Sequence, residues 1–336
     1  MSYNVAVVGA TGNVGRELLH ILAERKFPIN NIYALASENS LGKKISFGDD
    51  ITEVKNLADF DFSLVDIALF SAGSEVSAKY APIAAKSAIV IDNTSHFRLD
   101  ENVPLIITEV NLDQLDNYKN TNIIANPNCA VMQLMVALKP LHDACGIKRI
   151  VVTTLQSVSG AGTGAMDELF SQTKARFMGD KTPAKVFPKQ IAFNILPHIG
   201  DFDAEGNTAE ELKITQEIQK ILSPDICVSA TCVRIPVFIG HSESVNVEFE
   251  HPISAQMARE LLENAPGVIL MDDPEAQLNY ITPIECVGDD YVYVSRIRDD
   301  ISAHNCLNLW VVSDNLRKGA ALNAVQIAEE LVKNYI

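Results

Sequence analysis

The chain has 336 residues, of which 47% are hydrophobic and 21% charged, and its formal net charge is −16. This length predicts two domains of ordinary size, and the composition is typical of a soluble globular protein. The acidic excess argues against a nucleic-acid-binding protein, and no apolar run is long enough to predict a membrane span. An anionic small-molecule substrate is not excluded, because a local cluster of Arg and Lys can oppose the overall field.

The cysteines are scattered, with no C-x-x-C pair and no spacing typical of metal ligands. Most are expected to be buried packing residues, and we predict no metal site. A strand-like segment at the very start of the chain argues against a signal peptide, so we expect a protein of the reducing cytoplasm. The six cysteines are Cys129, Cys145, Cys227, Cys232, Cys286 and Cys306.

Up to about residue 126, short apolar runs alternate with helical stretches. This alternation predicts a parallel sheet with right-handed crossover connections. The expected strands cover residues 3–8, 32–37, 65–73, 88–93 and 122–126, and the first two expected helices cover residues 13–25 and 75–86.

After Cys129 the pattern changes. Residues 244–250 alternate strictly, with Val245, Val247 and Phe249 on one face, which is typical of a half-exposed strand in an antiparallel or mixed sheet. Residues 178–207 are expected to form a long loop region. Further strands are expected at 149–159, 291–298 and 306–314, and helices at 130–142 and 316–334.

Three glycines, Gly9, Gly12 and Gly15, stand between the first expected strand and the first expected helix. Glycines at this spacing let the backbone approach a pyrophosphate, and the helix N-terminus presents N–H groups to it. The motif therefore predicts a dinucleotide site, the alternative being a tight turn without a ligand.

The end of the second expected strand bears on which dinucleotide is bound. An acidic residue there favours a free ribose 2′-hydroxyl, and a cation favours a 2′-phosphate. Glu38 argues for NAD, and Lys43 and Lys44 are the nearby cations. These residues leave the choice between NAD and NADP open.

Cys129 lies where an expected strand leads into the N-terminus of an expected helix. This position favours a thiolate, and the carboxyl end of a parallel sheet is where such folds place an active site. Cys129 is therefore a candidate nucleophile, the alternative being a buried cysteine at a helix start.

Over nearly its whole length the chain resembles bacterial aspartate-semialdehyde dehydrogenases. Several separate motifs occur in the same order, which makes a chance resemblance implausible. The matching strings are VAVVGATGNVG (5–15), FSAGSEVS (70–77), DNTSHFR (92–98), NPNC (126–129), QSVSGAG (156–162), TAEELK (208–213), RIPVFIGHSESV (234–245) and SDNLRKGAALNAVQIAEEL (313–331).

The resemblance implies an α/β protein with a Rossmann-type parallel-sheet domain and an α+β mixed-sheet catalytic and dimerisation domain. The first domain would cover residues 1–127, completed by the C-terminal helix 316–336, and the second residues 128–315. The implied reaction is the NADP-dependent reductive dephosphorylation of L-4-aspartyl phosphate to aspartate 4-semialdehyde and phosphate. This step belongs to lysine (diaminopimelate), methionine and threonine biosynthesis, and the implied assembly is a homodimer, with a tetramer left open.

The resemblance also implies roles for individual residues. Cys129 would carry the acyl group, His241 would be the acid/base, and Gln156 would position the substrate. Arg234 would bind the substrate α-carboxylate and Glu210 its amino group. The phosphate would be bound by Arg98, Asn128 and Lys213.

The implied cofactor residues come from both halves of the chain. Related enzymes carry an Arg for the 2′-phosphate where this chain has Asn39, so NADP remains the implied cofactor with NAD as the alternative. The residues are Gly9, Thr11, Gly12, Asn13, Val14, Ser37, Asn39, Ser40, Ser159, Gly160, Asn323 and Gln326.

These residue types suit the chemistry, because a thiol can carry an acyl group, a histidine can handle a proton near neutral pH, and guanidinium groups bind carboxylate and phosphate. Taken singly, each has a structural alternative. His241 could be a buried structural histidine, Arg98 a surface charge, and Gln156 a link to a neighbouring strand.

Glu210 and Lys213 could be an ion pair on a helix that opens with a capping box of Thr208 and Glu211. Two other functions remain as alternatives. One is a related reductase acting on N-acetyl-glutamyl phosphate or malonyl-CoA, and the other is a dinucleotide-binding paralogue without catalysis. The strings that contain Glu210, Lys213 and Arg234 argue against the related reductase. The joint presence of Cys129, Gln156, Arg234 and His241 argues against a paralogue without catalysis.

Overall fold

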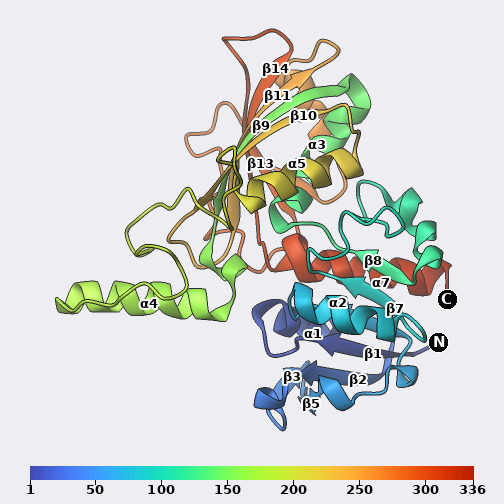
Figure 1. Ribbon diagram of the computed structural model, residues 1–336. Coiled ribbons are helices and arrows are strands. Elements are labelled where there is room, and N and C mark those ends of the chain that lie inside the picture. The colour runs from blue at the N-terminus through green and yellow to red at the C-terminus, as the bar shows by residue number, and fades with distance from the viewer. The chain divides into compact units, whose positions relative to one another are not determined.

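The computed structural model describes residues 1–336 and divides into two compact units, each built on a six-stranded sheet (Figure 1). The first unit comprises Met1–Asn128 and Ala320–Ile336. The second comprises Cys129–Gly319.

The sheet of the first unit is parallel throughout, in the order β5-β2-β1-β6-β7-β8. Numbered in chain order, this is the 3-2-1-4-5-6 order of the Rossmann fold, which reverses between β1 and β6. The β1 residues Val5–Val8 are buried, as expected for a parallel sheet covered on both faces. The strands are β1 Tyr3–Val8, β2 Ile29–Ala36, β5 Lys55–Asn56, β6 Ile67–Phe70, β7 Ile89–Asp92 and β8 Ile123–Ala125.

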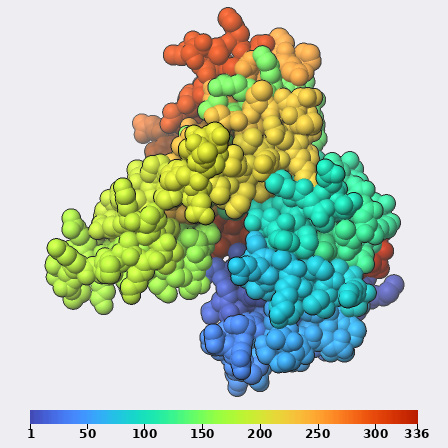
Figure 2. Space-filling view, viewed as in Figure 1, coloured from blue at the N-terminus to red at the C-terminus, as the bar shows by residue number.

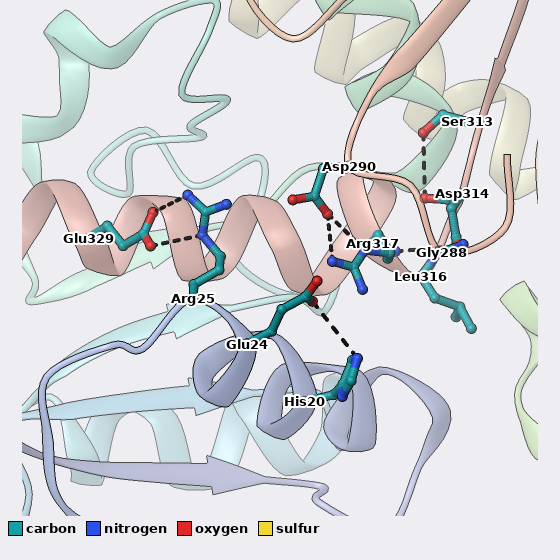
Figure 3. A network of polar contacts seen from close by, with 10 residues as sticks. All are labelled: His20, Glu24, Arg25, Gly288, Asp290, Ser313, Asp314, Leu316, Arg317 and Glu329. Atoms are coloured by element: carbon teal, nitrogen blue, oxygen red, sulfur yellow. Dashed lines mark hydrogen bonds and ion pairs between the residues drawn. The ribbon is translucent and has the colours of Figure 1, made fainter. Parts of the chain in front are cut away.

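The C-terminal helix belongs to this unit, where it packs on α1 and β7. Arg25 forms a two-pronged ion pair with Glu329 of α7, with both N–O distances at 2.8 Å (Figure 3). The Tyr3 hydroxyl donates to the carbonyl of Ile336, so both chain ends are tied together. The helices are α1 Asn13–Glu24, α2 Ser74–Ala84 and α7 Leu322–Asn334, and a separate hairpin has strands β3 Lys44–Phe47 and β4 Asp50–Glu53.

The turn between β1 and α1 depends on glycine. Gly9 has φ +86°, and a Cβ there would lie 2.9 Å from the backbone of Ser71 and Ala72 after β6. A Cβ on Gly15 would lie 2.1 Å from the carbonyl oxygen of Gly9. The turn and the start of α1 therefore close only if both positions lack a side chain.

The second unit has a mixed sheet in the order β10-β9-β11-β14-β13-β12. β9 runs parallel to β10 and antiparallel to β11. The end of β10, the end of β9 and the start of β11 therefore meet at one edge. The strands are β9 Ile147–Gln156, β10 Cys227–Arg234, β11 His241–Phe249, β12 Val268–Leu270, β13 Val292–Asp299 and β14 Cys306–Ser313.

The helix α3 packs on β9, β11, β13 and β14, with α5 and α6 as further neighbours, so it is buried nearly all round. The helix α4 instead projects from this unit, together with the segment that follows it (Figures 1 and 2). It carries exposed Phe170, Phe177 and Met178. The helices are α3 Cys129–Cys145, α4 Thr163–Met178, α5 Ala209–Ile221 and α6 Ala255–Leu262.

Several sequence predictions were wrong at their ends, such as the strand expected at 65–73, which covers only Ile67–Phe70. The strand expected at 149–159 stops at Gln156, because the chain then enters a 3₁₀ turn, Val158–Ala161. The helix expected from residue 316 begins at Leu322, because Arg317–Ala321 forms a π-helical turn. The loop expected at 178–207 is confirmed, since no helix or strand lies between α4 and α5.

We predict that Gly15→Ala lowers the melting temperature and weakens dinucleotide binding, because backbone atoms must move to admit the new Cβ. Overpacking of this kind costs about 1 to 3 kcal/mol. Gly164→Ala is the matched control, since its Cβ would meet nothing closer than 3.7 Å and alanine favours a helix. Equal melting temperatures for the two variants, measured by circular dichroism, would contradict this.

Candidate functional site

Cys129 and His241 are in direct contact within the second unit. The Sγ of Cys129, at the first position of α3, lies 3.2 Å from Nε2 of His241, at the first position of β11. The thiol is partly exposed, whereas His241 is completely buried. A helix N-terminus favours the thiolate form of a cysteine placed there.

The other ring nitrogen of His241 is held by Ser157. The Ser157 N–H donates to Nδ1 at 3.1 Å, and the Ser157 hydroxyl lies 3.0 Å from the same atom. Burial lowers the pKa of His241 well below its ordinary value, and the nearby charge of Arg234 adds to this effect. Both effects favour the neutral form of His241.

Arg234, at the end of β10, is 5% exposed and donates from Nη1 to the Ser157 carbonyl at 2.7 Å. Burial lowers the pKa of Arg234, and the charges of Cys129 and Glu210 partly offset this. A Cβ on Gly160 would lie 3.1 Å from Nη1 of Arg234 and 3.4 Å from Nε2 of His241. The bare backbone of Gly160 thus keeps open the space beside both side chains.

Gln156 and Glu210 continue the same cluster. Gln156 is 1% exposed, and its Nε2 donates to Oε1 of Glu210 at 3.3 Å. The Nζ atom of Lys213 lies 4.0 Å from Oε2 of Glu210 on the same helix. The capping box of Thr208 and Glu211 is present, so α5 starts where the sequence indicates. This arrangement places an amide, a carboxylate and an ammonium group near one another in the second unit.

Three residues at this site were missed by sequence reasoning. Ser157 acts mainly through its backbone, which no side-chain pattern reveals. Asn315 accepts hydrogen bonds from the Gly240 N–H and the Ser157 hydroxyl at 2.9 and 3.0 Å. A Cβ on Gly319 would lie 3.2 Å from Cβ of Cys129, so this glycine gives α3 room to start there. The residues that these three contact lie far away in the sequence, so no local pattern pointed to them. Gly319 lies within the string at 313–331 that matches the family, but the string alone does not show what the glycine contacts.

In the first unit, the predicted cofactor residues Gly9, Thr11, Gly12 and Ser37 line one cavity of about 510 Å³, together with Glu38. No side chain caps α1 at Gly12, so the helix N-terminus is open to an anion. This cradle fits a dinucleotide phosphate. The lining residues that the sequence did not indicate are Ala36, Asn56, Leu57, Ala58, Ser71, Ala72, Val76 and Tyr80.

The remaining predicted cofactor residues are more dispersed. Asn13 and Val14 form the first turn of α1, and Asn39 lies exposed in the 3₁₀ turn Glu38–Ser40. Ser40 is buried beside Lys43 Nζ, 3.2 Å away. Two others lie in α7, where Asn323 is completely buried and Gln326 partly so, and Ser159 and Gly160 belong to the second unit.

Asn323 is engaged within its own unit. Its amide donates to the carbonyl of Ile106 at 2.9 Å and to Asn126 Oδ1 at 2.6 Å, and it accepts from the Thr108 N–H. Gln326 lies 3.3 Å from the Thr108 hydroxyl. Both residues thus help hold α7 against the loop before β8.

Arg98 and Asn128, predicted to bind phosphate, are buried in the first unit. Arg98 donates from Nε to the carbonyl of Asn126 and from Nη2 to that of Asn93, both at 2.9 Å. The guanidinium group of Arg98 is therefore buried and held by two backbone carbonyls. The alternative from the sequence, that Arg98 is a surface charge, is wrong.

Comparison with known proteins decides the family. Residues 4–118 match the model of the semialdehyde dehydrogenase NAD binding domain, and residues 138–318 match that of the semialdehyde dehydrogenase dimerisation domain. The chain is 57% identical over 335 residues to aspartate-semialdehyde dehydrogenase of Rickettsia bellii, covering 99% of each chain. The chain belongs to the aspartate-semialdehyde dehydrogenase family.

The solved structures of this family agree with the fold. A crystal structure of aspartate semialdehyde dehydrogenase II from Vibrio cholerae, complexed with ASA, matches with a TM-score of 0.97 at 50% identity, covering 100% of both chains. A probable aspartate-semialdehyde dehydrogenase from Pseudomonas aeruginosa matches with a TM-score of 0.94 at 34% identity, again over 100% of both chains. The predicted family and fold class are confirmed. No helix of the chain has both the length and the apolar character that a membrane crossing requires.

A buried acid lies close to this site. Glu243 of β11 is completely buried, and burial raises its pKa well above the ordinary value. Its carboxyl oxygens have no well-formed hydrogen bond, and the amide of Gln133 on α3 compensates only in part. A buried carboxyl of this kind stays protonated, because its charged form has lost its water.

We predict that Glu243→Gln stabilises the protein at pH 8 and has little effect near pH 4.5. The folded wild type keeps a proton that the unfolded chain releases above its ordinary pKa of 4.5, so wild-type stability falls as the pH rises from there. The melting temperatures of wild type and Glu243→Gln, measured between pH 4.5 and pH 8, test this prediction. The partly exposed Glu248 on the same strand, whose pKa is lowered by its hydrogen bond with Lys148, is the control, and Glu248→Gln should not stabilise the protein at pH 8.

Proposed function

We propose that the protein is a phosphorylating aspartate-semialdehyde dehydrogenase that converts L-4-aspartyl phosphate to L-aspartate 4-semialdehyde and phosphate. The observation that carries the proposal is the 3.2 Å contact between Sγ of Cys129 and Nε2 of His241, in a chain that belongs to this family. The product would enter lysine (diaminopimelate), methionine and threonine biosynthesis.

Cys129 is the proposed nucleophile. Its thiolate attacks the acyl carbon of the substrate, a C–S bond forms, and the C–O bond to phosphate breaks as phosphate leaves with the electron pair. The thioester so formed keeps the acyl group on the enzyme until it is reduced. When bound, the nicotinamide cofactor supplies the hydride for that reduction. The thiolate is then released as the aldehyde forms.

His241 is the proposed acid/base at this centre, because it faces the sulfur that carries the acyl group. Gln156 is proposed to position the substrate, since it is buried in the same cluster and bonded to Glu210. Arg234 would bind the substrate α-carboxylate and Glu210 its amino group. A buried guanidinium already fixed by a backbone carbonyl is well suited to bind a carboxylate with little further ordering.

Arg98, Asn128 and Lys213 are proposed as the phosphate-binding residues. Support comes from Arg98, whose guanidinium is already ordered by two backbone carbonyls. A fixed guanidinium binds an anion with a smaller loss of side-chain entropy than a mobile one.

For the cofactor we propose NADP, with NAD as the second candidate. NADP follows the family resemblance, and a structural neighbour from Candida albicans is described with NADP. NAD is favoured by the cavity itself, whose lining includes Glu38 and no Lys or Arg. The residues proposed to hold the cofactor are Gly9, Thr11, Gly12, Asn13, Val14, Ser37, Asn39, Ser40, Ser159, Gly160, Asn323 and Gln326.

We further propose that the chain forms a homodimer through the second unit. The match of residues 138–318 to a dimerisation domain supports this. So do the exposed apolar side chains of α4 and the segment after it, among them Phe177 at 80% and Phe193 at 63% exposure.

Six free cysteines support a reducing compartment such as the cytoplasm.

The test of the proposed function is phosphate-dependent oxidation of aspartate semialdehyde, the reverse direction, followed by reduction of NAD⁺ or NADP⁺. We predict that Cys129→Ala abolishes turnover and leaves dinucleotide binding intact. Cys227→Ala is the control, because this thiol is also accessible but lies at the other end of β10 from Arg234. Absence of turnover in the wild type, or Cys129→Ala activity within about tenfold of it, would refute the proposal.

A second measurement decides the cofactor. We predict that Asn39→Arg raises the ratio of kcat/KM for NADP⁺ over NAD⁺, because a cation would stand where a 2′-phosphate is bound. The gain expected for one exposed charge pair is several-fold, since such pairs contribute up to about 1 kcal/mol. Asn31→Arg is the control, because Asn31 is exposed near the start of β2, at the other end of that strand from the Glu38–Ser40 turn, and it should leave the ratio unchanged. An unchanged ratio in Asn39→Arg would exclude position 39 as a determinant.

A further inference from the structure

The helix α4, which projects from the second unit (Figure 1), carries two buried polar side chains, Glu168 and Gln172. They lie one turn apart on the same face of the helix. The Nε2 group of Gln172 donates to Oε1 of Glu168 at 3.1 Å. A charged side chain is seldom buried unless hydrogen bonds replace its lost water. Neither residue has a part in the proposed chemistry.

The carboxylate of Glu168 binds the chain segment that follows α4. Its Oε2 accepts from the N–H groups of Lys185 and Val186 at 2.7 and 2.6 Å. Its Oε1 accepts from the N–H group of Phe187 at 3.4 Å. Successive backbone N–H groups that converge in this way bind anions, and here the anion is a side chain of the same protein. Both carboxylate oxygens are therefore needed as acceptors.

Gln172 binds the same segment further along. Its Oε1 accepts from the N–H groups of Ile191 and Ala192 at 2.9 and 3.1 Å. These two residues are completely buried, in an apolar cluster that includes Leu169 of α4. Polar and apolar contacts thus both hold segment 185–196 against the helix.

Segment 185–196 reaches the backbone of Arg234 at its far end. Leu196 and Arg234 form a bridge, in which the Arg234 N–H donates to the Leu196 carbonyl at 2.8 Å and the Leu196 N–H donates to the Arg234 carbonyl at 3.0 Å. The guanidinium group of Arg234 is held separately, by the carbonyl of Ser157. The backbone of Arg234 is therefore paired with a segment that α4 holds in place.

The same segment forms part of the wall of a cavity beside Arg234. Residues 185–188 line this cavity of about 530 Å³ together with Arg234, Ala161 and residues 198–201. The N–H groups of three of these wall residues are the ones that Glu168 binds. Release of the segment would therefore change both the cavity wall and the backbone of the arginine that lines it.

We propose that Glu168 and Gln172 are positioning residues for substrate binding, because they fix segment 185–196 and, through it, the backbone of Arg234 and the wall of its cavity. This rests on the proposed function, in which Arg234 binds the α-carboxylate of the substrate. Cys129 and His241 lie on other elements, α3 and β11. Loss of the contacts on α4 therefore weakens substrate binding more than it slows the chemical step.

The test is steady-state oxidation of aspartate semialdehyde by the full-length protein, with phosphate and dinucleotide saturating. We expect Glu168→Gln to raise KM about tenfold, equivalent to about 1.4 kcal/mol, and to change kcat by less than about threefold. The amide sets a donor against N–H groups that the carboxylate accepts, and an unsatisfied buried donor has a cost of this order. Asp167→Asn removes the same charge from an exposed position of α4 and should leave KM unchanged.

A double variant, Glu168→Gln with Gln172→Glu, supplies a rescue. With the two groups exchanged, the amide at position 168 donates to the carboxylate at position 172. The N–H groups of residues 185–186 and 191–192 again meet oxygens, and only the long contact with Phe187 is lost. We expect KM of the double variant to lie within about threefold of the wild-type value.

Hydrogen exchange of segment 185–196, followed by mass spectrometry, gives a readout that needs no turnover. We expect faster exchange in Glu168→Gln and a return to wild-type exchange in the double variant. The proposal is overturned if Glu168→Gln keeps the wild-type KM, if kcat falls while KM is unchanged, or if the double variant keeps the KM of Glu168→Gln. Absence of turnover in the wild type would instead refute the proposed function, so the two failures are distinct.

Discussion

The proposed catalytic cluster depends on one backbone unit, that of Ser157, where β9 ends. Its N–H group holds Nδ1 of His241 and its carbonyl holds Nη1 of Arg234. Those two side chains come from β11 and β10, the strands on either side of β9. Because β10 is parallel to β9 and β11 is antiparallel, one strand ends and the other begins at the same edge. A wholly parallel or wholly antiparallel arrangement would not bring these two residues to Ser157 in this way.

The sequence predicted the parts of the fold that have a local or periodic signal. The parallel sheet of the first unit, the start of α3 at Cys129 and the alternation of β11 are of this kind. The strand β10 was missed because its alternation rests on small side chains, with Ala230 and Cys232 following Val228 on the inner face, which gives a weaker signal than the alternation of β11. The helix α4 was missed for a related reason, since it projects from its unit and needs no continuous apolar face. Local periodicity reports burial, and these two elements are only partly buried.

The same limit applies to the site. Cys129 and the glycine turn could be found because their chemistry is tied to a strand end and a helix start. Family resemblance brought in Gln156, Arg234 and His241, which spacing alone left ambiguous. Ser157 and Asn315 could not be found from a sequence, because their hydrogen bond joins residues 158 positions apart. Buried polar contacts of this length require the folded arrangement of β9 and β14.

The proposed sites in the two units are shaped by different physical means. This difference decides which properties of each site a side-chain substitution can change. In the first unit the phosphate cradle exists because Gly9 and Gly15 have no Cβ, whereas Glu38 and Asn39 are exposed and structurally free to vary. In the second unit the clamp on His241 and Arg234 is made by backbone atoms of residue 157. Substitution there removes the hydroxyl and leaves both backbone groups in place. Cofactor preference is therefore open to single exposed substitutions, while the positions of His241 and Arg234 are protected by the fold itself.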